Sequence, residues 1–137
     1  MFKLVKINGG RINVPETIVY NIDGTTPYTA GCLYFISYDG ILNEPSGETD
    51  IKFIPLETIP KNSGKKKIKG FIVNSDMVFE TEIAGGTYNV GRGDIIAACK
   101  NSDGDMESVD SLHGSDARLI SKDSALIDRK VLVALEW

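Results

Sequence analysis

The sequence has little of the material from which catalytic and redox sites are usually built. It contains one histidine, His113, and two cysteines, Cys32 and Cys99, without a C-x-x-C pair. Zinc binding and thiol–disulfide chemistry therefore lack their basic sequence unit. Each cysteine lies in an apolar run, which is typical of a buried free thiol. The sequence leaves open whether the two form a disulfide.

Long hydrophobic runs and an excess of positive charge are also missing. No stretch reaches the roughly 18 consecutive apolar residues of a membrane-spanning helix, and the N-terminus does not have the pattern of a signal peptide. The net charge is −4 and the isoelectric point is about 5.0. Phosphate backbones attract basic surfaces, so we expect neither nucleic acid nor a membrane as a partner. We identify no cofactor site.

The sequence does contain a repeated alternation of apolar and polar residues. The alternation over residues 17–22, 77–83 and 130–136 is typical of strands with one buried face. Asp39-Gly40 and Asp103-Gly104 are typical of tight hairpins, and 14 glycines are spread along the chain. We predict strands at residues 2–8, 11–14, 17–22, 32–38, 51–56, 66–73, 77–83, 94–99, 106–110, 116–121 and 130–136.

This spacing of strands predicts an all-β protein, a compact antiparallel β-barrel or sandwich with little helix. The chain has 137 residues, of which 42% are hydrophobic. A chain of this size can bury a core without disulfides. We therefore expect residues 1–137 to form a single domain, in which Ser121–Asp128 is the best candidate for a turn of helix.

Two short motifs resemble catalytic or metal-binding signatures, and we prefer a structural interpretation of each. His113 lies between Ser111 and Asp116, but the members of a catalytic triad usually come from distant segments, and no G-x-S-x-G elbow is present. Asn101, Asp103 and Asp105 resemble the start of a calcium loop, but the glycine falls one residue early. We expect a surface histidine and a plain hairpin turn, with cation binding at the turn left open.

The sequence therefore predicts no catalytic residue, no metal site and no enzymatic activity. Arg92-Gly93-Asp94 spells a tripeptide that some cell-surface receptors bind, but its context favours a turn that enters a strand. The one dense basic cluster is Lys65, Lys66 and Lys67, followed by Lys69. Two interpretations stay open for it: an edge strand protected by lysines, or a contact with an acidic partner surface.

The order of segments resembles that of the small head-decoration, or capsid cement, proteins of tailed bacteriophages. The segments that carry this resemblance are Gly9-Gly10-Arg11-Ile12-Asn13-Val14-Pro15-Glu16, Tyr28-Thr29-Ala30-Gly31-Cys32-Leu33, Ile51-Lys52-Phe53-Ile54-Pro55-Leu56-Glu57, Met77-Val78-Phe79-Glu80-Thr81, Val90-Gly91-Arg92-Gly93-Asp94, the Asp103-Gly104 hairpin and Asp116-Ala117-Arg118-Leu119-Ile120. The resemblance extends over most of the chain as a similar order of segments, without a single diagnostic motif.

The resemblance implies a virion structural protein without a reaction to perform. Such a protein is made in the host cytoplasm, binds the major capsid protein or other virion proteins on the capsid surface, and stabilises the assembled head by bridging capsid subunits. It also implies a homo-oligomer, either a trimer or a dimer. We expect partner contacts at Phe2, Arg11, Pro15, Lys65, Lys66, Lys67 and Trp137.

Two other functions remain to be distinguished from this one. A small ligand- or carbohydrate-binding β-barrel predicts a concave pocket lined by several of Tyr20, Tyr28, Tyr34, Tyr38 and Tyr88. A filled barrel interior would count against it. A hydrolase that uses His113 predicts a nucleophile and an acid within hydrogen-bond reach of the imidazole ring.

Overall fold

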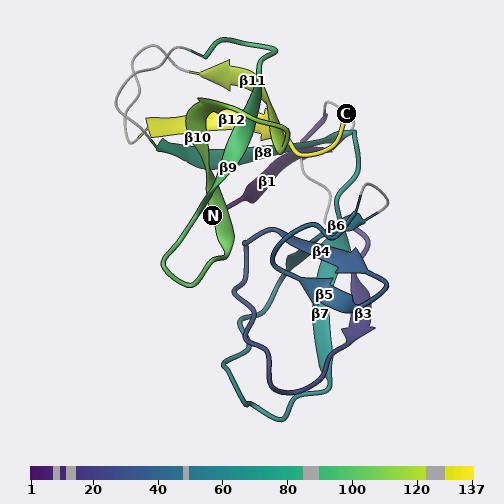
Figure 1. Ribbon diagram of the computed structural model, residues 1–137. Coiled ribbons are helices and arrows are strands. Elements are labelled where there is room, and N and C mark those ends of the chain that lie inside the picture. Colours follow the sequence, from purple (N-terminus) through teal and green to yellow (C-terminus); the bar gives the residue numbers. More distant parts are fainter. Residues whose placement is uncertain (8–9, 12–14, 48–49, 85–89, 123–128) are drawn as a thin grey trace.

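A computed structural model of the protein describes residues 1–7, 10–11, 15–47, 50–84, 90–122 and 129–137. The protein is all-β, as predicted, and its strands form two sheets that lie one above the other in Figure 1. Within the described residues no helix is long and apolar enough to cross a membrane. The strands are β1 (Lys3–Ile7), β2 (Gly10–Arg11), β3 (Ile18–Asn21), β4 (Tyr34–Ser37), β5 (Gly40–Leu42), β6 (Ile51–Pro55), β7 (Lys67–Ile72), β8 (Met77–Ala84), β9 (Ile95–Lys100), β10 (Met106–His113), β11 (Ala117–Lys122) and β12 (Lys130–Ala134).

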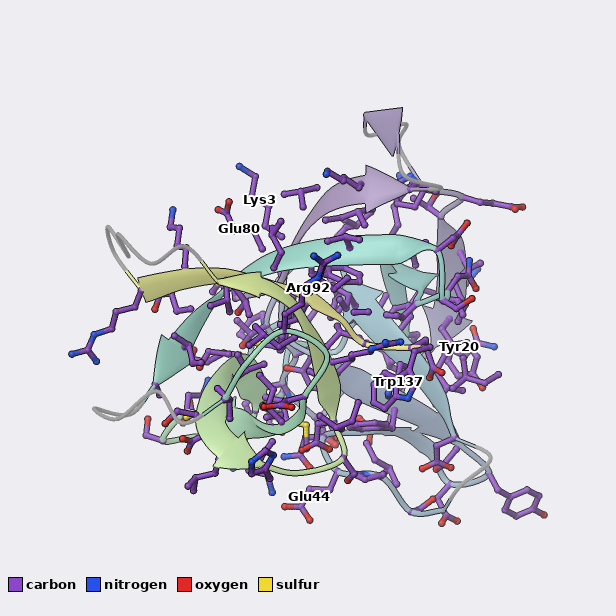
Figure 2. The ribbon with its side chains drawn as sticks, turned by 90° about the horizontal axis from the view of Figure 1, so that it is seen from above. Lys3, Tyr20, Glu44, Glu80, Arg92 and Trp137 are labelled. Atoms are coloured by element: carbon purple, nitrogen blue, oxygen red, sulfur yellow. The ribbon has the colours of Figure 1, made fainter. Side chains whose placement is uncertain are left out.

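The larger sheet closes on itself as a five-stranded barrel of β8, β12, β11, β9 and β10. The closing contact is a parallel pairing between β10 and the end of β8, at Val109↔Ile83. The first half of β8 pairs instead with β1, where Lys3 and Glu80 are Cα partners and project outward (Figure 2). Because one long strand serves two neighbours in turn, β1 and β2 extend the barrel without opening it.

The barrel interior is filled by side chains. Residues on β8 alternate as predicted, with Phe79 and Ile83 buried on the inner face and Glu82 exposed on the outer face. The remaining strands contribute buried aliphatic residues from their own inner faces: Ile96, Val109, Leu119, Val131 and Val133. A packed barrel of this size leaves no room for a ligand at its centre, which counts against the binding-barrel hypothesis in its simplest form.

Strands β3 to β7 form the smaller sheet, in the order β3-β7-β6-β4-β5, and this sheet curls into a half-barrel. The half-barrel segment is inserted in the chain between β2 and β8, two strands of the larger sheet. The inner face carries a second apolar cluster of Ile22, Tyr28, Cys32, Tyr34, Ile41, Phe53, Ile59 and Ile68.

The two sheets share the main apolar cluster of the protein. Phe71 of β7 stacks on Phe79 of β8, with ring centroids 6.3 Å apart and an interplanar angle of 3°. The backbone N–H of Leu33 donates to the carbonyl of Met106 at 2.8 Å. Burial of large apolar surface between two elements is what usually makes them unfold together.

The strand boundaries agree closely with the prediction, but β5 was missed and the end of β10 was wrong. β10 was predicted to end at residue 110, but it continues to His113. The barrel interpretation of the fold is correct, and both predicted hairpin turns are present, with positive φ at Gly40 (+108°) and Gly104 (+83°). Of the predicted helical turn, Ser121 and Lys122 belong to β11, and residues 123–128 lie outside the described residues.

Candidate functional site

The basic cluster lies at the start of β7 and on the turn before it. Lys65, Lys66 and Lys67 are all exposed, and two of them are engaged within the chain. Lys65 forms an ion pair with Glu57 at 3.5 Å, and Lys66 donates to the backbone carbonyl of Asp23 at 2.8 Å. The edge-strand interpretation is wrong, because β7 pairs with β3 on one side and β6 on the other.

Lys67 and Lys69 instead face solvent from the middle of the half-barrel sheet. Lys69 is the Cα partner of Val19 on β3, and its carbonyl accepts a hydrogen bond from the backbone N–H of Leu56. Val19 is 61% exposed and Leu56 is 48% exposed. We call these four residues, Val19, Leu56, Lys67 and Lys69, the basic face. Neither lysine forms an ion pair with any described residue.

The other expected contact residues lie in different surroundings. The predicted partner contact at Phe2 is wrong, because the Phe2 side chain is buried in the main apolar cluster and is not available to a partner. Pro15 is half-buried, and the side chain of Arg11 lies outside the described residues. Trp137 is 52% exposed and lies over the Nζ of Lys52, which is 5.3 Å from the centre of the ring. Lys52 also binds Glu136 and the carbonyl of Leu135, so the C-terminal residues are attached to β6.

The surroundings of His113 do not support a hydrolase site, and those of the Arg-Gly-Asp tripeptide support a structural turn. The His113 side chain is exposed and forms no hydrogen bond or ion pair with any described residue, so the hydrolase arrangement is not assembled around it in this part of the chain. Asp94 accepts a hydrogen bond from the backbone N–H of Gly91 at 2.7 Å. This bond and the positive φ of Gly93, +91°, identify the tripeptide as a turn before β9.

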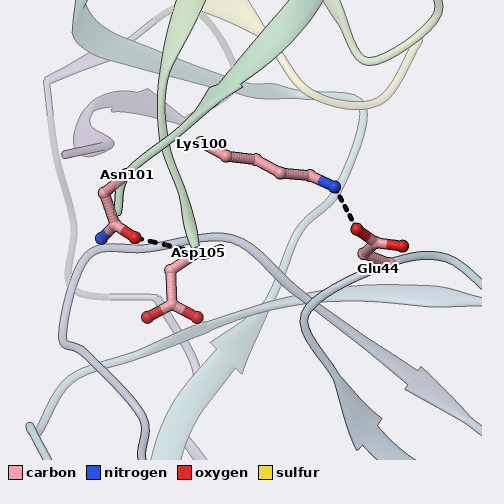
Figure 3. A network of polar contacts seen from close by, with 4 residues as sticks. All are labelled: Glu44, Lys100, Asn101 and Asp105. Carbon is pink, nitrogen blue, oxygen red and sulfur yellow. Dashed lines mark hydrogen bonds and ion pairs between the residues drawn. The ribbon is translucent and has the colours of Figure 1, made fainter. Parts of the chain in front are cut away.

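A groove of about 580 Å³ lies where the open side of the half-barrel meets the β9–β10 hairpin. Its acidic lining comes from the loop after β3, the β4–β5 turn and the hairpin, which contribute Asp23, Asp39, Asp103 and Asp105. Two buried tyrosines, Tyr28 and Tyr34, form its floor, with ring centroids 5.3 Å apart. We call this feature the acidic groove. An ion pair between Lys100 and Glu44 attaches the hairpin to the loop after β5 (Figure 3).

Asp105 is the buried carboxylate of the groove. Only 7% of its surface is exposed, and desolvation raises the pKa of its carboxyl group, with the negative charges of Asp103 and Glu107 acting in the same direction. The nearby Tyr34 hydroxyl acts on the pKa in the opposite direction. Figure 3 shows the backbone nitrogen of Asp105 bound by Asn101 while the carboxylate points away from both Asn101 and Lys100.

The hairpin turn itself uses the oxygen that a calcium loop would need. The Asn101 side-chain oxygen accepts hydrogen bonds from the backbone N–H groups of Asp103 at 2.9 Å and Asp105 at 3.0 Å. This bonding confirms the plain hairpin turn. Among the described residues, no three His, Cys, Asp or Glu side chains converge on a point where a metal ion could be held.

The two cysteines are not linked. Cys32 is buried in the half-barrel, as predicted, and burial raises the pKa of its thiol to about 11. Cys99 is only half-buried, which is more exposed than predicted. A thiol with such a raised pKa carries almost no thiolate at neutral pH, so Cys32 is chemically inert.

We expect Asp105→Asn to raise stability at neutral pH. Because the folded-state pKa of Asp105 is raised, the folded protein binds a proton more tightly, and stability falls as pH rises from the unfolded pKa through the folded one. The variant should gain about 1 kcal/mol at pH 7, typical of relieving a poorly satisfied buried polar group. Below the unfolded pKa the gain should vanish. Urea unfolding of both proteins across this pH range measures it, and a gain that is equally large in acid would contradict the assignment.

Comparisons with known proteins identify no relative. No family model, no curated protein and no solved structure matches the chain.

Proposed function

We propose that this protein is a non-enzymatic structural component of a tailed-phage virion, a decoration protein that binds the assembled head and bridges its subunits. The observation that carries the proposal is the basic face. Two exposed apolar side chains, Val19 and Leu56, lie there beside two lysines that have no ion-pair partner among the described residues. The phage assignment itself is supported by the resemblance in segment order.

The chemistry of the basic face fits an acidic protein surface. The chain as a whole carries a net charge of −4, so the basic face is a positively charged patch on an acidic protein. Two copies of the protein would repel each other if their basic faces came together. Exposed apolar residues surrounded by charge are a common composition at the centre of a protein contact. Charge complementarity of this kind sets the rate and orientation of docking. An acidic patch on the major capsid protein is the partner that this face would recognise.

The first experiment measures mass by light scattering at two protein concentrations, with and without undecorated tailed-phage heads. The proposal expects discrete dimers or trimers that bind the heads at a fixed stoichiometry. A monomer that binds none of the heads would contradict it. Sedimentation of the heads with bound protein gives the stoichiometry independently.

We expect the double substitution Lys67→Glu and Lys69→Glu to weaken head binding by about tenfold or more, because reversed charges face an acidic partner across the contact. Both side chains are exposed, so the fold should be retained, and circular dichroism checks this. The matched control is the double substitution Lys3→Glu and Lys6→Glu on β1, which reverses two exposed lysines of the other sheet. Equal weakening by the control would show that overall charge, and not the basic face, governs binding.

The alternative function, a small ligand- or carbohydrate-binding module, is favoured by the acidic groove. Tyr28 and Tyr34 line the groove, as the binding-barrel hypothesis expects, whereas Tyr38 is fully exposed and is not among the lining residues. Sugar recognition by stacking needs an accessible ring face, however, and these two rings are only 4% and 1% exposed. The Tyr34 hydroxyl is also occupied, since it accepts a hydrogen bond from the Thr29 backbone N–H at 2.8 Å. The groove therefore presents negative charge to a ligand, and its tyrosine rings are too buried to stack on a sugar.

A further inference from the structure

Strand β3 is an unprotected edge of the half-barrel sheet. It pairs with β7 on one side, and none of the described strands pairs with its other side (Figure 1). Edge strands are usually kept short, charged or interrupted by a bulge, which prevents unwanted pairing. The sequence of β3, Ile-Val-Tyr-Asn, has no charge and no proline, and its register with β7 is continuous. The edge strands β2 and β5 are shorter, with two and three residues.

The phase of the β3–β7 ladder shows which backbone groups face the open edge. Just beyond β3, Ile22 donates its N–H to the carbonyl of Lys66 at 2.9 Å. Because hydrogen-bonded pairs alternate along an antiparallel ladder, Tyr20 also bonds to β7, whereas the N–H and C=O groups of Val19 and Asn21 point away from it. No hydrogen bond from another described segment reaches these four groups. They are free to pair with an added strand.

The side chains beside this edge differ between its two faces. On the outer face, Val19 is 61% exposed and its Cα partner on β7 is Lys69. Asn21 is also exposed, and its Cα partner is Lys67. On the inner face, Tyr20 is only partly buried against the apolar cluster of the half-barrel. An added strand would therefore meet lysines on its outer side and an apolar surface on its inner side.

Charge complementarity selects the occupant of the edge. Lys67 and Lys69 form no ion pair with any described residue, and β7 lies two strand spacings, about 10 Å, from a strand added beside β3. A carboxylate on that strand and the flexible stem of a lysine can meet across the short side chains of Val19 and Asn21. Pairing with β3 of a second copy would instead place two basic faces side by side. An acidic segment of a different protein suits both the backbone edge and the lysines.

We propose that the partner of the basic face adds an extended acidic segment to the half-barrel as a further strand beside β3. Its acidic residues face Lys67 and Lys69, and the apolar residues that alternate with them cover Tyr20. Main-chain hydrogen bonds to Val19 and Asn21 supply the pairing, and the alternating side chains supply specificity. This inference rests on the proposed function, because it takes the basic face as the contact surface and names the form of its partner.

The test is the binding of capped six-residue peptides to the isotope-labelled full chain, followed by nuclear magnetic resonance at neutral pH and low salt. One peptide alternates glutamate with valine, and its counterpart has lysine in place of glutamate. We expect saturable shifts of the Val19 and Asn21 amide signals with the glutamate peptide, and binding of the lysine peptide that is weaker by about tenfold or more. The same two amide protons should exchange rapidly in the free protein and slowly in the complex.

Methylation of the peptide nitrogens tests strand pairing without altering the protein. Alternate amides of an added strand face β3, and the others face solvent. N-methylation of one alternate set should weaken binding by about tenfold or more, and the matched control, N-methylation of the other set, by less than about twofold. The sensitive set is that of the glutamates if the added strand is antiparallel and that of the valines if it is parallel.

Substitutions in the protein test the charge and the edge separately. Lys67→Glu with Lys69→Glu should reverse the preference, so that the lysine peptide binds more tightly. The matched control, Lys3→Glu with Lys6→Glu on β1, should keep the preference for the glutamate peptide. Val19→Pro removes an edge-facing N–H and spares the β3–β7 ladder, as proline does on an edge strand. It should weaken binding of the glutamate peptide by about tenfold or more.

Several results would overturn the added strand. They are the absence of saturable shifts at millimolar peptide, slow exchange of the Val19 and Asn21 amides in the free protein, and equal tolerance of the two methylation patterns. Dimerisation through β3 without peptide would assign the edge to a second copy and would also overturn it. Phage heads are assayed separately. Heads that bind while the peptide does not would refute the strand alone, and a peptide that binds while heads do not would refute the capsid assignment alone.

Discussion

Replacing Gly70 by alanine is expected to destabilise the protein by about 3 kcal/mol, the upper end of the usual cost of over-packing. Gly70 lies in the middle of β7, where it is the Cα partner of Ile18 on one side and Pro55 on the other. A Cβ atom added there would come within 2.3 Å of Cζ of Phe53 and 2.5 Å of the carbonyl oxygen of Ile54. Either the ring or the backbone must move.

The reason for so large an effect is that neither neighbour can move cheaply. Phe53 is fully buried and packs over Gly70 from the adjacent strand, as aromatic rings often do over a glycine in a sheet. The Ile54 carbonyl belongs to the paired backbone of β6, so moving it would disturb the ladder between β6 and β7. The measurement is the free energy of unfolding from urea titration of Gly70→Ala and the wild type.

Gly47→Ala is the matched control for this substitution. A Cβ atom at Gly47 would have no heavy atom within 4 Å, and its φ is not positive. This alanine should be neutral or stabilise by a few tenths of a kcal/mol, because it restricts the unfolded chain. In addition, Phe53→Leu in the Gly70→Ala background should restore part of the lost stability, since it removes the ring atoms of the clash. Additive effects of the two substitutions would contradict the proposed contact.

The strands were predictable because the pattern that signals a strand is local. On β8 and β12, apolar residues alternate with polar or partly exposed ones over the whole element, and burial of one face follows directly from that alternation. β5 was missed because Gly40–Leu42 is too short to show a period. Its hairpin turn was nevertheless predictable from Asp39-Gly40, since the turn depends on those residues alone.

The position of each strand in its sheet was not predictable from the same pattern. The lysines of β7 suggested an edge, but they occupy the outward face of a central strand, and its inner face carries Ile68 and Gly70. A lysine indicates that one face of a strand is exposed to solvent, but it does not indicate whether the two edges of the strand are paired. In the same way, Phe2 is apolar and near a terminus, which is equally compatible with a partner contact and with the core position it occupies.

The acidic groove was beyond the reach of the sequence because its residues come from separate turns. Asp39 and Asp105 were each assigned to a hairpin, correctly, but only the fold brings the two hairpins together. Tyr28 and Tyr34 were named as candidates for a pocket on residue type alone. A signal that could have singled out Asp105 is its place just before Met106, at the point where the hairpin enters a buried strand.

The second large effect is expected from Phe79→Ala, which should cost about 3–5 kcal/mol. Phe79 is fully buried at the centre of β8, between its Cα partners Leu4 of β1 and Val133 of β12. It also stacks on Phe71 of the half-barrel. The substitution therefore leaves a cavity in the barrel and removes the main aromatic contact between the two sheets.

This variant also tests whether the barrel and the half-barrel unfold as one unit. Four of the five tyrosines, Tyr20, Tyr28, Tyr34 and Tyr38, belong to the half-barrel segment. In a Tyr88→Phe, Trp137→Phe background the near-ultraviolet circular dichroism of tyrosine therefore reports that segment. Far-ultraviolet circular dichroism reports both sheets. Because the shared cluster joins the sheets, both signals should shift to the same lower midpoint in Phe79→Ala, and the milder Phe79→Leu should shift them together by less. If the tyrosine signal kept its wild-type midpoint while the far-ultraviolet signal split, the half-barrel would be an independent folding unit, and the single-domain interpretation would be wrong.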